Sequence, residues 1–413
     1  MVMRQVRGLA VVAAILFGAT ALTVLTSAAE PASSETTAAE RTTVQPGGKP
    51  PGKTDPELLS ENVSMYPRGV QLGHNGDANG TIVASVTTFT GRGGEAAIFR
   101  SEDEGASFEQ ISLIPLTQFN GQTGLCCGSI FELPQAVGDL PAGTLLFSAS
   151  VGQDEGPDRR MDLDIWQSQD AGKTWAYLST CASARNSGGL WEPEFSVDAY
   201  GRLVCHYADE TDILDGTQSL VRVVSEDGVT WGERSYTVQA TDEGRRAGMP
   251  VVRTLPDGTY VMIFEVCARP GQYDCAAYAR YSDDGWNWGD PQAHGEIITS
   301  VHDRYFAHAP TVAVVEDGTP RGTLLVVGQL LLEEDGSLAK GSGSTIFVNR
   351  AGNPVWQEIP APIAVPDAFN HWCPNYSSAL IPLAGSRAFV ELASDLGDDG
   401  VCRASFARGT IHP

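Results

Sequence analysis

Residues 168–175 read Ser-Gln-Asp-Ala-Gly-Lys-Thr-Trp, and this short pattern recurs along the chain. Four clear copies begin at Ser101, Ser168, Ser225 and Ser282, and a worn fifth copy spans 349–356. In each copy the Asp is suited to accept hydrogen bonds from nearby backbone N–H groups, and the Gly to take a left-handed turn position. We interpret each copy as a turn between two strands. Its carboxylate is expected to be structural, because catalysis needs one asymmetric site and not a repeated corner.

A second, longer repeat sets the number of units. Six segments share a tight polar or proline-bearing start, an apolar run, a turn and a second apolar run. They start near Tyr66, Gly128, Trp191, Gly248, His308 and Cys373. Their spacing of 57–65 residues fits a four-stranded blade with loops, in which the short motif joins the two outer strands. The sequence predicts an all-β, six-bladed β-propeller of antiparallel blades over 61–413, with the segment near 55–65 completing the last blade.

Composition supports a folded, turn-rich protein. The chain has 413 residues, 42% of them hydrophobic, with 45 Gly and 24 Pro, so a disordered chain is excluded. The net charge of −24 repels phosphate backbones and anionic lipid. We therefore expect no nucleic-acid or membrane partner, and a monomer.

The N-terminal region resembles an export signal. Arg4 and Arg7 precede an apolar run over 9–25, and small residues follow at 27–29. We predict a signal peptide over 1–29, a flexible leader over 30–60 and a secreted protein. The alternative, a transmembrane anchor, is disfavoured because the apolar run is short for a bilayer.

Eight cysteines in an exported chain predict disulfides and not metal ligands. Cys267 and Cys275 flank a short loop, and Cys373 and Cys402 fall in neighbouring strands of one repeat. The adjacent Cys126 and Cys127 are not expected to bond to each other. No catalytic metal and no cofactor is expected.

Propeller topology brings candidate site residues to one face. The first two strands of a blade are antiparallel, so the start of the first and the end of the second lie together. This face is expected to collect Arg68, Glu192, Glu194, Arg246, His308 and Tyr376 from the strand starts, and Asp209 and Glu265 from the strand ends. Such a ring of polar groups around a central pit is typical of a carbohydrate site.

Two glutamates carry the predicted chemistry. Glu265 ends an apolar strand, where a carboxyl group is costly and its pKa should rise, unless it only forms a salt bridge. Glu192 opens the third blade, and Glu194 has the same strand parity, so the pattern leaves both as candidates. Two carboxyl groups on opposite sides of a sugar ring can cleave a glycosidic bond, one as acid and one as nucleophile or base.

Three neighbours have supporting roles in this prediction. Tyr376 is placed to hydrogen-bond the nucleophile, with aromatic packing as the alternative. Arg68 and Arg246 are expected to bind sugar hydroxyls or to keep the carboxylates ionised, with surface ion pairing as the alternative.

Five motifs together resemble the exo-α-1,5-L-arabinanases. They are Tyr66-Pro67-Arg68-Gly69, Trp191-Glu192-Pro193, Arg246-Ala247-Gly248-Met249-Pro250, Phe264-Glu265 and Tyr376-Ser377. The resemblance spans about residues 60–413. It implies a retaining propeller enzyme that releases arabinobiose from linear arabinan, a neutral polysaccharide, with activity carried by Glu192, Glu265 and Tyr376. Which glutamate is the nucleophile stays open.

Two alternatives remain. The short motifs also resemble the Asp-boxes of sialidases, and Tyr376 with an arginine cluster would suit an exo-sialidase. However, 87–92 contains no Asp for the expected catalytic position, and no third Arg lies at a clear blade start. A non-catalytic glycan-binding propeller is the other alternative, which the paired glutamates disfavour.

Overall fold

The computed structural model describes residues 54–411 except 90–93, 116–122, 213–215, 242–243, 269–270 and 351–354. The predicted signal peptide and residues 30–53 of the predicted leader lie outside the described residues. Within the described ranges, no helix is both long enough and apolar enough to cross a membrane.

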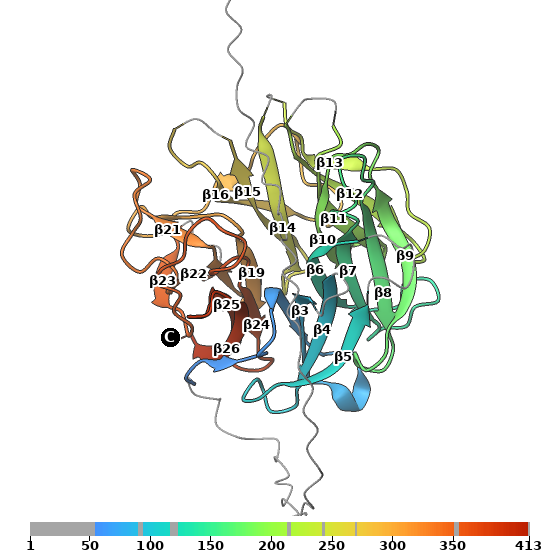
Figure 1. Cartoon of the computed structure of the whole chain (residues 1–413), viewed down its shortest axis with the longest axis horizontal. Helices are drawn as coiled ribbons and strands as arrows, with labels where there is room; N and C mark the ends of the chain where they lie inside the picture. The colour runs from blue at the N-terminus through green and yellow to red at the C-terminus, as the bar shows by residue number, and fades with distance from the viewer. Residues whose placement is uncertain are drawn as a thin grey trace, which may run out of the picture. The chain divides into compact units, whose positions relative to one another are not determined.

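Six antiparallel sheets follow one another around a ring, each with its first strand innermost (Figure 1). The first blade is β2 (Met65–Gln71), β3 (Ile82–Phe89), β4 (Gly94–Ser101) and β5 (Glu109–Pro115). The second is β6 (Leu125–Glu132), β7 (Leu145–Val151), β8 (Asp162–Ser168) and β9 (Ala176–Ser183). The third is β10 (Leu190–Val197), β11 (Leu203–Asp209), β12 (Ser219–Ser225) and β13 (Ser235–Val238). A short 3-10 helix, η1 (Gly76–Ala78), lies between β2 and β3.

The fourth blade is larger than predicted. It comprises β14 (Arg246–Thr254), β15 (Tyr260–Cys267), β16 (Ala276–Ser282) and β17 (Glu296–Ile297), and β16 also pairs with β18 (Tyr305–Ala307), which carries β21 (Leu330–Leu332). The fifth blade is β19 (Thr311–Val315), β20 (Thr323–Val327), β22 (Thr345–Arg350) and β23 (Gln357–Pro360). The sixth is β24 (Ala379–Pro382), β25 (Ala388–Leu396), β26 (Cys402–Thr410) and β1 (Glu57–Leu58).

The two ends of the propeller meet in the sixth blade. Strand β1 pairs antiparallel with β26, with Glu57 opposite Phe406. The prediction that the segment near 55–65 completes the last blade is confirmed. The predicted six-bladed propeller is likewise confirmed.

The four clear copies of the short motif form outer turns, as predicted, and 351–354 of the fifth copy lie outside the described residues. In the first copy, Asp103 accepts hydrogen bonds from the backbone N–H groups of Ala106 (3.0 Å) and Ser107 (2.9 Å), and Ser101 donates its hydroxyl to the same carboxylate. These bonds lower the pKa of Asp103 although burial opposes them. The carboxylate is fully used within the turn, so its role is structural.

The core lies between facing blades. Val83 and Ile98 of the first blade pack with Phe147 and Trp166 of the second, and all four are almost completely buried. Burying such a side chain contributes roughly 1.5–3 kcal/mol. Because each sheet is covered on both faces, its strands are apolar on both sides.

Each blade starts with a residue in the left-handed region of the backbone. These residues are Tyr66 (φ 52°), Cys127 (61°), Glu192 (52°), Met249 (58°), Ala309 (46°) and Ser377 (56°). In the first four blades the residue sits in a β-bulge, where the strand register shifts. A bulge adds one residue and re-aims the side chains around it. Such backbone costs of order 1–3 kcal/mol per residue and is concentrated at functional sites.

The disulfides correct one prediction and confirm two. Cys267 bonds to Cys275, and Cys373 to Cys402, as expected. Cys126 bonds to Cys127, contrary to the prediction. The left-handed backbone of Cys127, inside its bulge, lets adjacent side chains turn toward each other. A fourth bond joins Cys181 of β9 to Cys205 of β11, linking two blades.

Candidate active site

Glu192 lies in the bulge at the start of β10. Its carboxylate accepts a hydrogen bond from the backbone N–H of Met249 in the next blade, at 3.0 Å. The pKa of Glu192 is raised to about 7, mainly by burial and also by the negative charge of Glu210, against the lowering effects of the Met249 bond and nearby Arg246. Glu192 is therefore a carboxyl group that titrates near neutrality.

Glu265 lies at the end of β15, one blade further on. Its carboxylate accepts a hydrogen bond from the backbone N–H of Ala309, at 2.7 Å. Burial raises the pKa of Glu265 to about 8, and the charge of Glu192 contributes to this rise against the Ala309 bond. Each glutamate is thus held by the left-handed residue that opens the following blade.

Gly248 separates the two glutamates. It is the cross-strand partner of Glu265 in the β14–β15 pair. A Cβ atom on Gly248 would lie 3.8 Å from Glu192 Oε2 and 2.4 Å from Gln218 Nε2. A larger residue here would displace the Gln218 amide and crowd the Glu192 carboxylate. The two carboxyl groups therefore face the same short stretch of β14 from neighbouring blades.

Two tyrosines and a methionine form the floor beside the glutamates. The hydroxyl groups of Tyr66 and Tyr376 lie 3.9 and 3.8 Å from the sulfur of Met249. Burial raises the pKa of Tyr376 well above its ordinary value, and the charges of Glu192 and Glu265 add to the shift. Tyr376 therefore remains protonated and can donate a hydrogen bond.

Arg68 lies beneath these rings. Its guanidinium group sits 4.2 Å from the centre of the Tyr66 ring and donates to Ser377 Oγ (2.7 Å) and to the Ser377 carbonyl oxygen (2.9 Å). It lowers the pKa of Glu192. Most of the Arg68 donors are used within the protein, so few are left to bind sugar hydroxyls. Its effect on Glu192 supports the other predicted role, which is to keep a carboxylate ionised.

Arg246, at the start of β14, lies close enough to Glu192 and Glu265 for its charge to lower the pKa of both. Its guanidinium group contacts the carboxylate of Glu210 and donates to Gln218 Oε1 at 2.5 Å. Burial alone would raise the pKa of Glu210, but Arg246 and a hydrogen bond from Trp191 bring it below its ordinary value. Arg246 and Glu210 together form a fixed ion pair next to Glu192.

The structure separates Glu194 from Glu192. The register shifts between Trp191 and Glu194, so the two glutamates do not share the parity that the sequence predicted. Glu194 is buried and forms an ion pair with Arg253, at 2.6 Å. It is a structural partner of the neighbouring strand, and the substrate-binding role predicted for it is not supported by its contacts.

Asp209 also departs from the prediction. It is buried at the end of β11, where its carboxylate accepts hydrogen bonds from Thr211 and pairs with Arg234 at 2.9 Å. Its carboxylate is therefore occupied by partners within its own blade. The next residue, Glu210, is the acidic group that reaches the site. A search that allowed one residue beyond each strand end would have found it.

His308 is adjacent to the Ala309 amide that binds Glu265. Its own backbone N–H donates to the carbonyl oxygen of Cys275 at 3.0 Å. Burial lowers the pKa of His308, so the ring is neutral at neutral pH. Its ring lies near the sulfur atoms of Cys267 and Cys275, but these sulfurs are bonded to each other.

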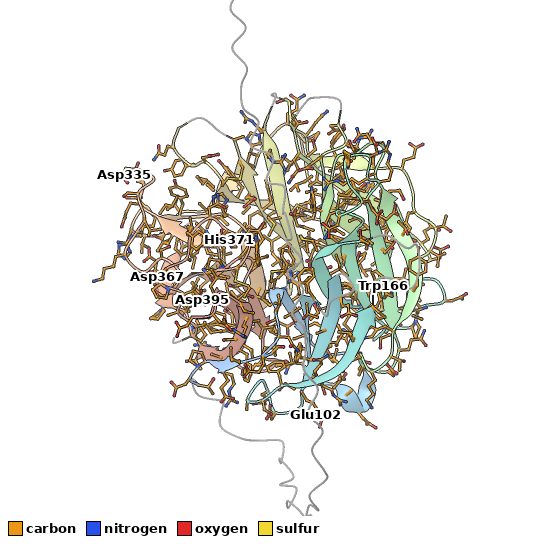
Figure 2. All side chains as sticks on the ribbon, viewed as in Figure 1. Glu102, Trp166, Asp335, Asp367, His371 and Asp395 are labelled. Carbon is orange, nitrogen blue, oxygen red and sulfur yellow. A yellow bond between two sulfur atoms is a disulfide. The ribbon has the colours of Figure 1, made fainter. Side chains whose placement is uncertain are left out.

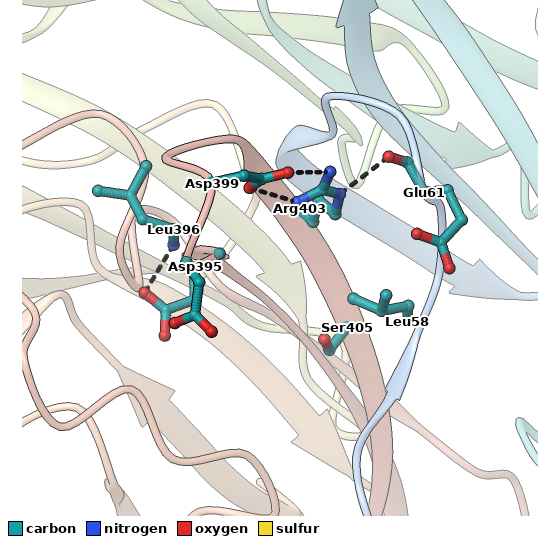
Figure 3. Close-up of a pocket in the computed structure, with 9 residues that line it drawn as sticks. Leu58, Glu61, Asp395, Leu396, Asp399, Arg403 and Ser405 are labelled. Atoms are coloured by element: carbon teal, nitrogen blue, oxygen red, sulfur yellow. Dashed lines mark hydrogen bonds and ion pairs between the residues drawn. The ribbon is translucent and has the colours of Figure 1, made fainter.

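A separate hollow lies on the outer edge of the sixth blade (Figure 3). Its lining includes Leu58, Glu61 and Asp395, and its Arg403 is held by both carboxylate oxygens of Asp399 at 2.8 Å. Neither Glu192 nor Glu265 lines it. The candidate active site is the cluster of residues around these two glutamates and not this hollow.

Solved structures similar to this one include two arabinan-related hydrolases and a sialidase. An α-L-arabinanase of Penicillium chrysogenum, complexed with arabinobiose, matches with a TM-score of 0.71 at 25% identity, over 86% of this chain and 98% of that chain. A GH93 α-L-arabinofuranosidase of Fusarium graminearum, with arabinobiose, matches with a TM-score of 0.69 at 22% identity, over 87% and 98%. The NanB sialidase of Streptococcus pneumoniae matches with a TM-score of 0.53 at 10% identity, over 86% and 69%. No family model and no curated protein matches the chain.

The six-bladed fold and its similarity to the arabinanase and arabinofuranosidase structures identify a glycoside hydrolase of the six-bladed propeller class. Within that class, the resemblance to the exo-α-1,5-L-arabinanases is confirmed at the level of fold.

Proposed function

We propose that this protein is a secreted exo-acting arabinanase that releases arabinobiose from α-linked arabinan by a two-glutamate, retaining mechanism. The observation that carries the proposal is the placement of Glu192 and Glu265 on neighbouring blades, either side of Gly248. The similar arabinanase and arabinofuranosidase, both complexed with arabinobiose, support the choice of sugar.

The raised pKa values of the two glutamates suit this chemistry. One carboxyl group must enter the reaction protonated to give its proton to the leaving oxygen, and the other must be ionised to attack the anomeric carbon. The pKa values are about 7 for Glu192 and about 8 for Glu265. Because their charges interact, the pair titrates together and can share one proton near neutral pH.

The surrounding residues influence which of the two glutamates holds the shared proton. The fixed Arg246–Glu210 pair and the buried Arg68 adjust the field at Glu192. The protonated Tyr376 hydroxyl is placed by Met249 to donate to an ionised carboxylate when substrate fills the pit. Catalysis in this proposal requires no metal and no cofactor.

A neutral sugar fits the site better than a sialic acid. Arg68 and Arg246 already donate to internal partners, so they are poorly placed to bind a substrate carboxylate. A ring of acidic side chains would also repel an anionic sugar. These contacts disfavour the sialidase alternative.

A product analysis tests the proposal. The purified protein is incubated with linear arabinan, branched arabinan and a sialoside, and the released sugar is identified by mass. Arabinobiose from linear arabinan, with the α anomer formed first in NMR spectra, is the expected result. Release of sialic acid, or of no sugar from any substrate, contradicts the proposal. The N-terminus of protein recovered from the culture medium tests export.

A further inference from the structure

Two exposed aromatic side chains and a half-buried histidine lie together in the segment between β23 and β24. We call Phe369, His371 and Trp372 the aromatic platform. Phe369 is 50% exposed and Trp372 41% exposed. The ring of His371 lies 5.3 Å from Phe369 and 4.5 Å from Trp372, with interplanar angles of 38° and 36°. The three rings thus form a continuous surface that the proposed mechanism does not use.

The platform is held rigidly from below. Cys373, directly after it, is fully buried and bonds to Cys402 of β26. Ala368, before it, packs in a small apolar core with Ile363 and Ala393. Large exposed rings on a rigid base keep their shape and lose little entropy when a ligand covers them.

Buried Gln329 connects the aromatic platform to His308, the neighbour of the residue that binds Glu265. The Gln329 side chain donates to the carbonyl oxygens of His371 and Pro374, and its backbone N–H donates to the carbonyl oxygen of His308. His308 precedes the Ala309 amide that binds Glu265. In Figure 2 the labelled His371 lies closer to the middle of the ring than Asp335 does. The platform is therefore connected through Gln329 to the segment that orients Glu265.

The chemistry of the surroundings restricts what the platform can bind. The segment 361–378 contains no Lys or Arg. Asp367 lies in it and is close enough to raise the pKa of Asp395. An anionic ligand is disfavoured by these charges. The C–H faces of neutral sugar rings pack well against exposed aromatic rings.

We propose that the aromatic platform binds the part of a linear arabinan chain that extends beyond the cleaved unit. This inference rests on the proposed function. Its occupant is a neutral polysaccharide that enters the pit at one end and lies across Phe369 and Trp372 at the other. The platform would then decide which chain lengths are good substrates, without contact with the reacting atoms.

Steady-state kinetics with oligosaccharides of increasing length test this role. Trp372→Ala is compared with Trp372→Phe and with Tyr200→Ala, which removes an exposed aromatic ring in the β10–β11 turn, on the opposite face. Trp372→Ala is expected to raise KM for long arabino-oligosaccharides about tenfold, the upper range for one aromatic contact, with kcat and the KM for arabinotriose unchanged. Both comparison variants should behave as wild type. An equal effect on arabinotriose and on long chains, or none on either, overturns the proposal.

A binding measurement separates failure of the platform from failure of the proposed function. In the Glu265→Gln background, linear arabinan should change tryptophan fluorescence, and the added Trp372→Phe change should remove most of that signal. If wild-type protein releases no sugar, the proposed hydrolase activity fails, but this binding assay still reports on the platform. Binding with an unchanged signal in the double variant, or no binding at all, overturns the platform.

Discussion

The carboxylate of Glu192 accepts a hydrogen bond from the backbone N–H of Met249, at 3.0 Å. Met249 has left-handed backbone, as does Ala309, whose N–H serves Glu265 in the same way. In both pairs, the carboxyl group of one blade is oriented by the backbone N–H of a left-handed residue that opens the following blade. The left-handed starts of these two blades are therefore part of the site, because each fixes the direction of one carboxyl group.

Replacing either glutamate should abolish hydrolysis. Glu192→Gln and Glu265→Gln each keep the size of the side chain but remove its proton transfer or nucleophilic attack. Loss of a general acid or base lowers kcat about 10²–10⁴-fold. Rates on linear arabinan, with circular dichroism to confirm folding, check this. Retention of more than a tenth of the wild-type rate in either variant would contradict the assignment.

Glu194→Gln is the matched control for Glu192→Gln. Because Glu194 is buried against Arg253, its loss weakens that ion pair and should lower the free energy of unfolding by about 1–2 kcal/mol. The rate on arabinan should stay within about threefold of wild type. Urea unfolding and kinetics on the same preparations check the two outcomes. A larger loss of rate with unchanged stability would return Glu194 to the list of catalytic candidates.

The free energy of unfolding should fall as the pH rises through the pKa values of Glu192 and Glu265. Their folded-state pKa values, about 7 and about 8, lie above the ordinary value of 4.5. The native state therefore holds protons that the unfolded state has released, and stability is lost as pH rises from about 4.5 through 8. Glu265→Gln removes one of these groups. The melting temperature of this variant should fall less than that of wild type between pH 5 and 8. Parallel plots of melting temperature against pH for the two proteins would refute the raised pKa of Glu265.

Glu210→Gln should shift the pH dependence of the reaction. Glu210 raises the pKa of Glu192 and also holds Arg246, which lowers it. Without this negative charge the pKa of Glu192 should move downward, because Arg246 is still held by Gln218 and its positive charge is no longer balanced. The basic limb of kcat/KM against pH should move to lower pH if Glu192 is the acid, and the acidic limb if it is the nucleophile. The same measurement thus assigns the roles of the two glutamates.

The control for this measurement is Glu333→Gln. Glu333 pairs with Arg304, at 3.0 Å, well away from the pit. Its pH profile should match that of wild type. A profile of Glu210→Gln that also matches wild type would remove Glu210 from the electrostatics of the site.

Loss of an outer-turn carboxylate should affect stability alone. Asp103→Ala removes the acceptor for the N–H groups of Ala106 and Ser107. We expect a loss of about 1–2 kcal/mol in the free energy of unfolding, as for loss of a helix cap, with unchanged kcat. Thermal unfolding and arabinan kinetics check this. A loss of activity in the folded variant would show that this motif has more than a structural role.

The blades could be read from the sequence because they are locally encoded. Alternating apolar residues and the repeated Ser-Asp-Gly turns specify each hairpin, and the start of one strand always meets the end of the next. This also placed Glu192, Glu265, Arg68 and Tyr376 around one pit. The selection among neighbours came only from tertiary structure. A bulge inserts a residue without disturbing the apolar pattern, so it separated Glu192 from Glu194 and joined Cys126 to Cys127. Glu210 replaces Asp209 in the site because Asp209 is held by Thr211 and Arg234, whereas the residue just beyond the strand pairs with Arg246 beside Glu192.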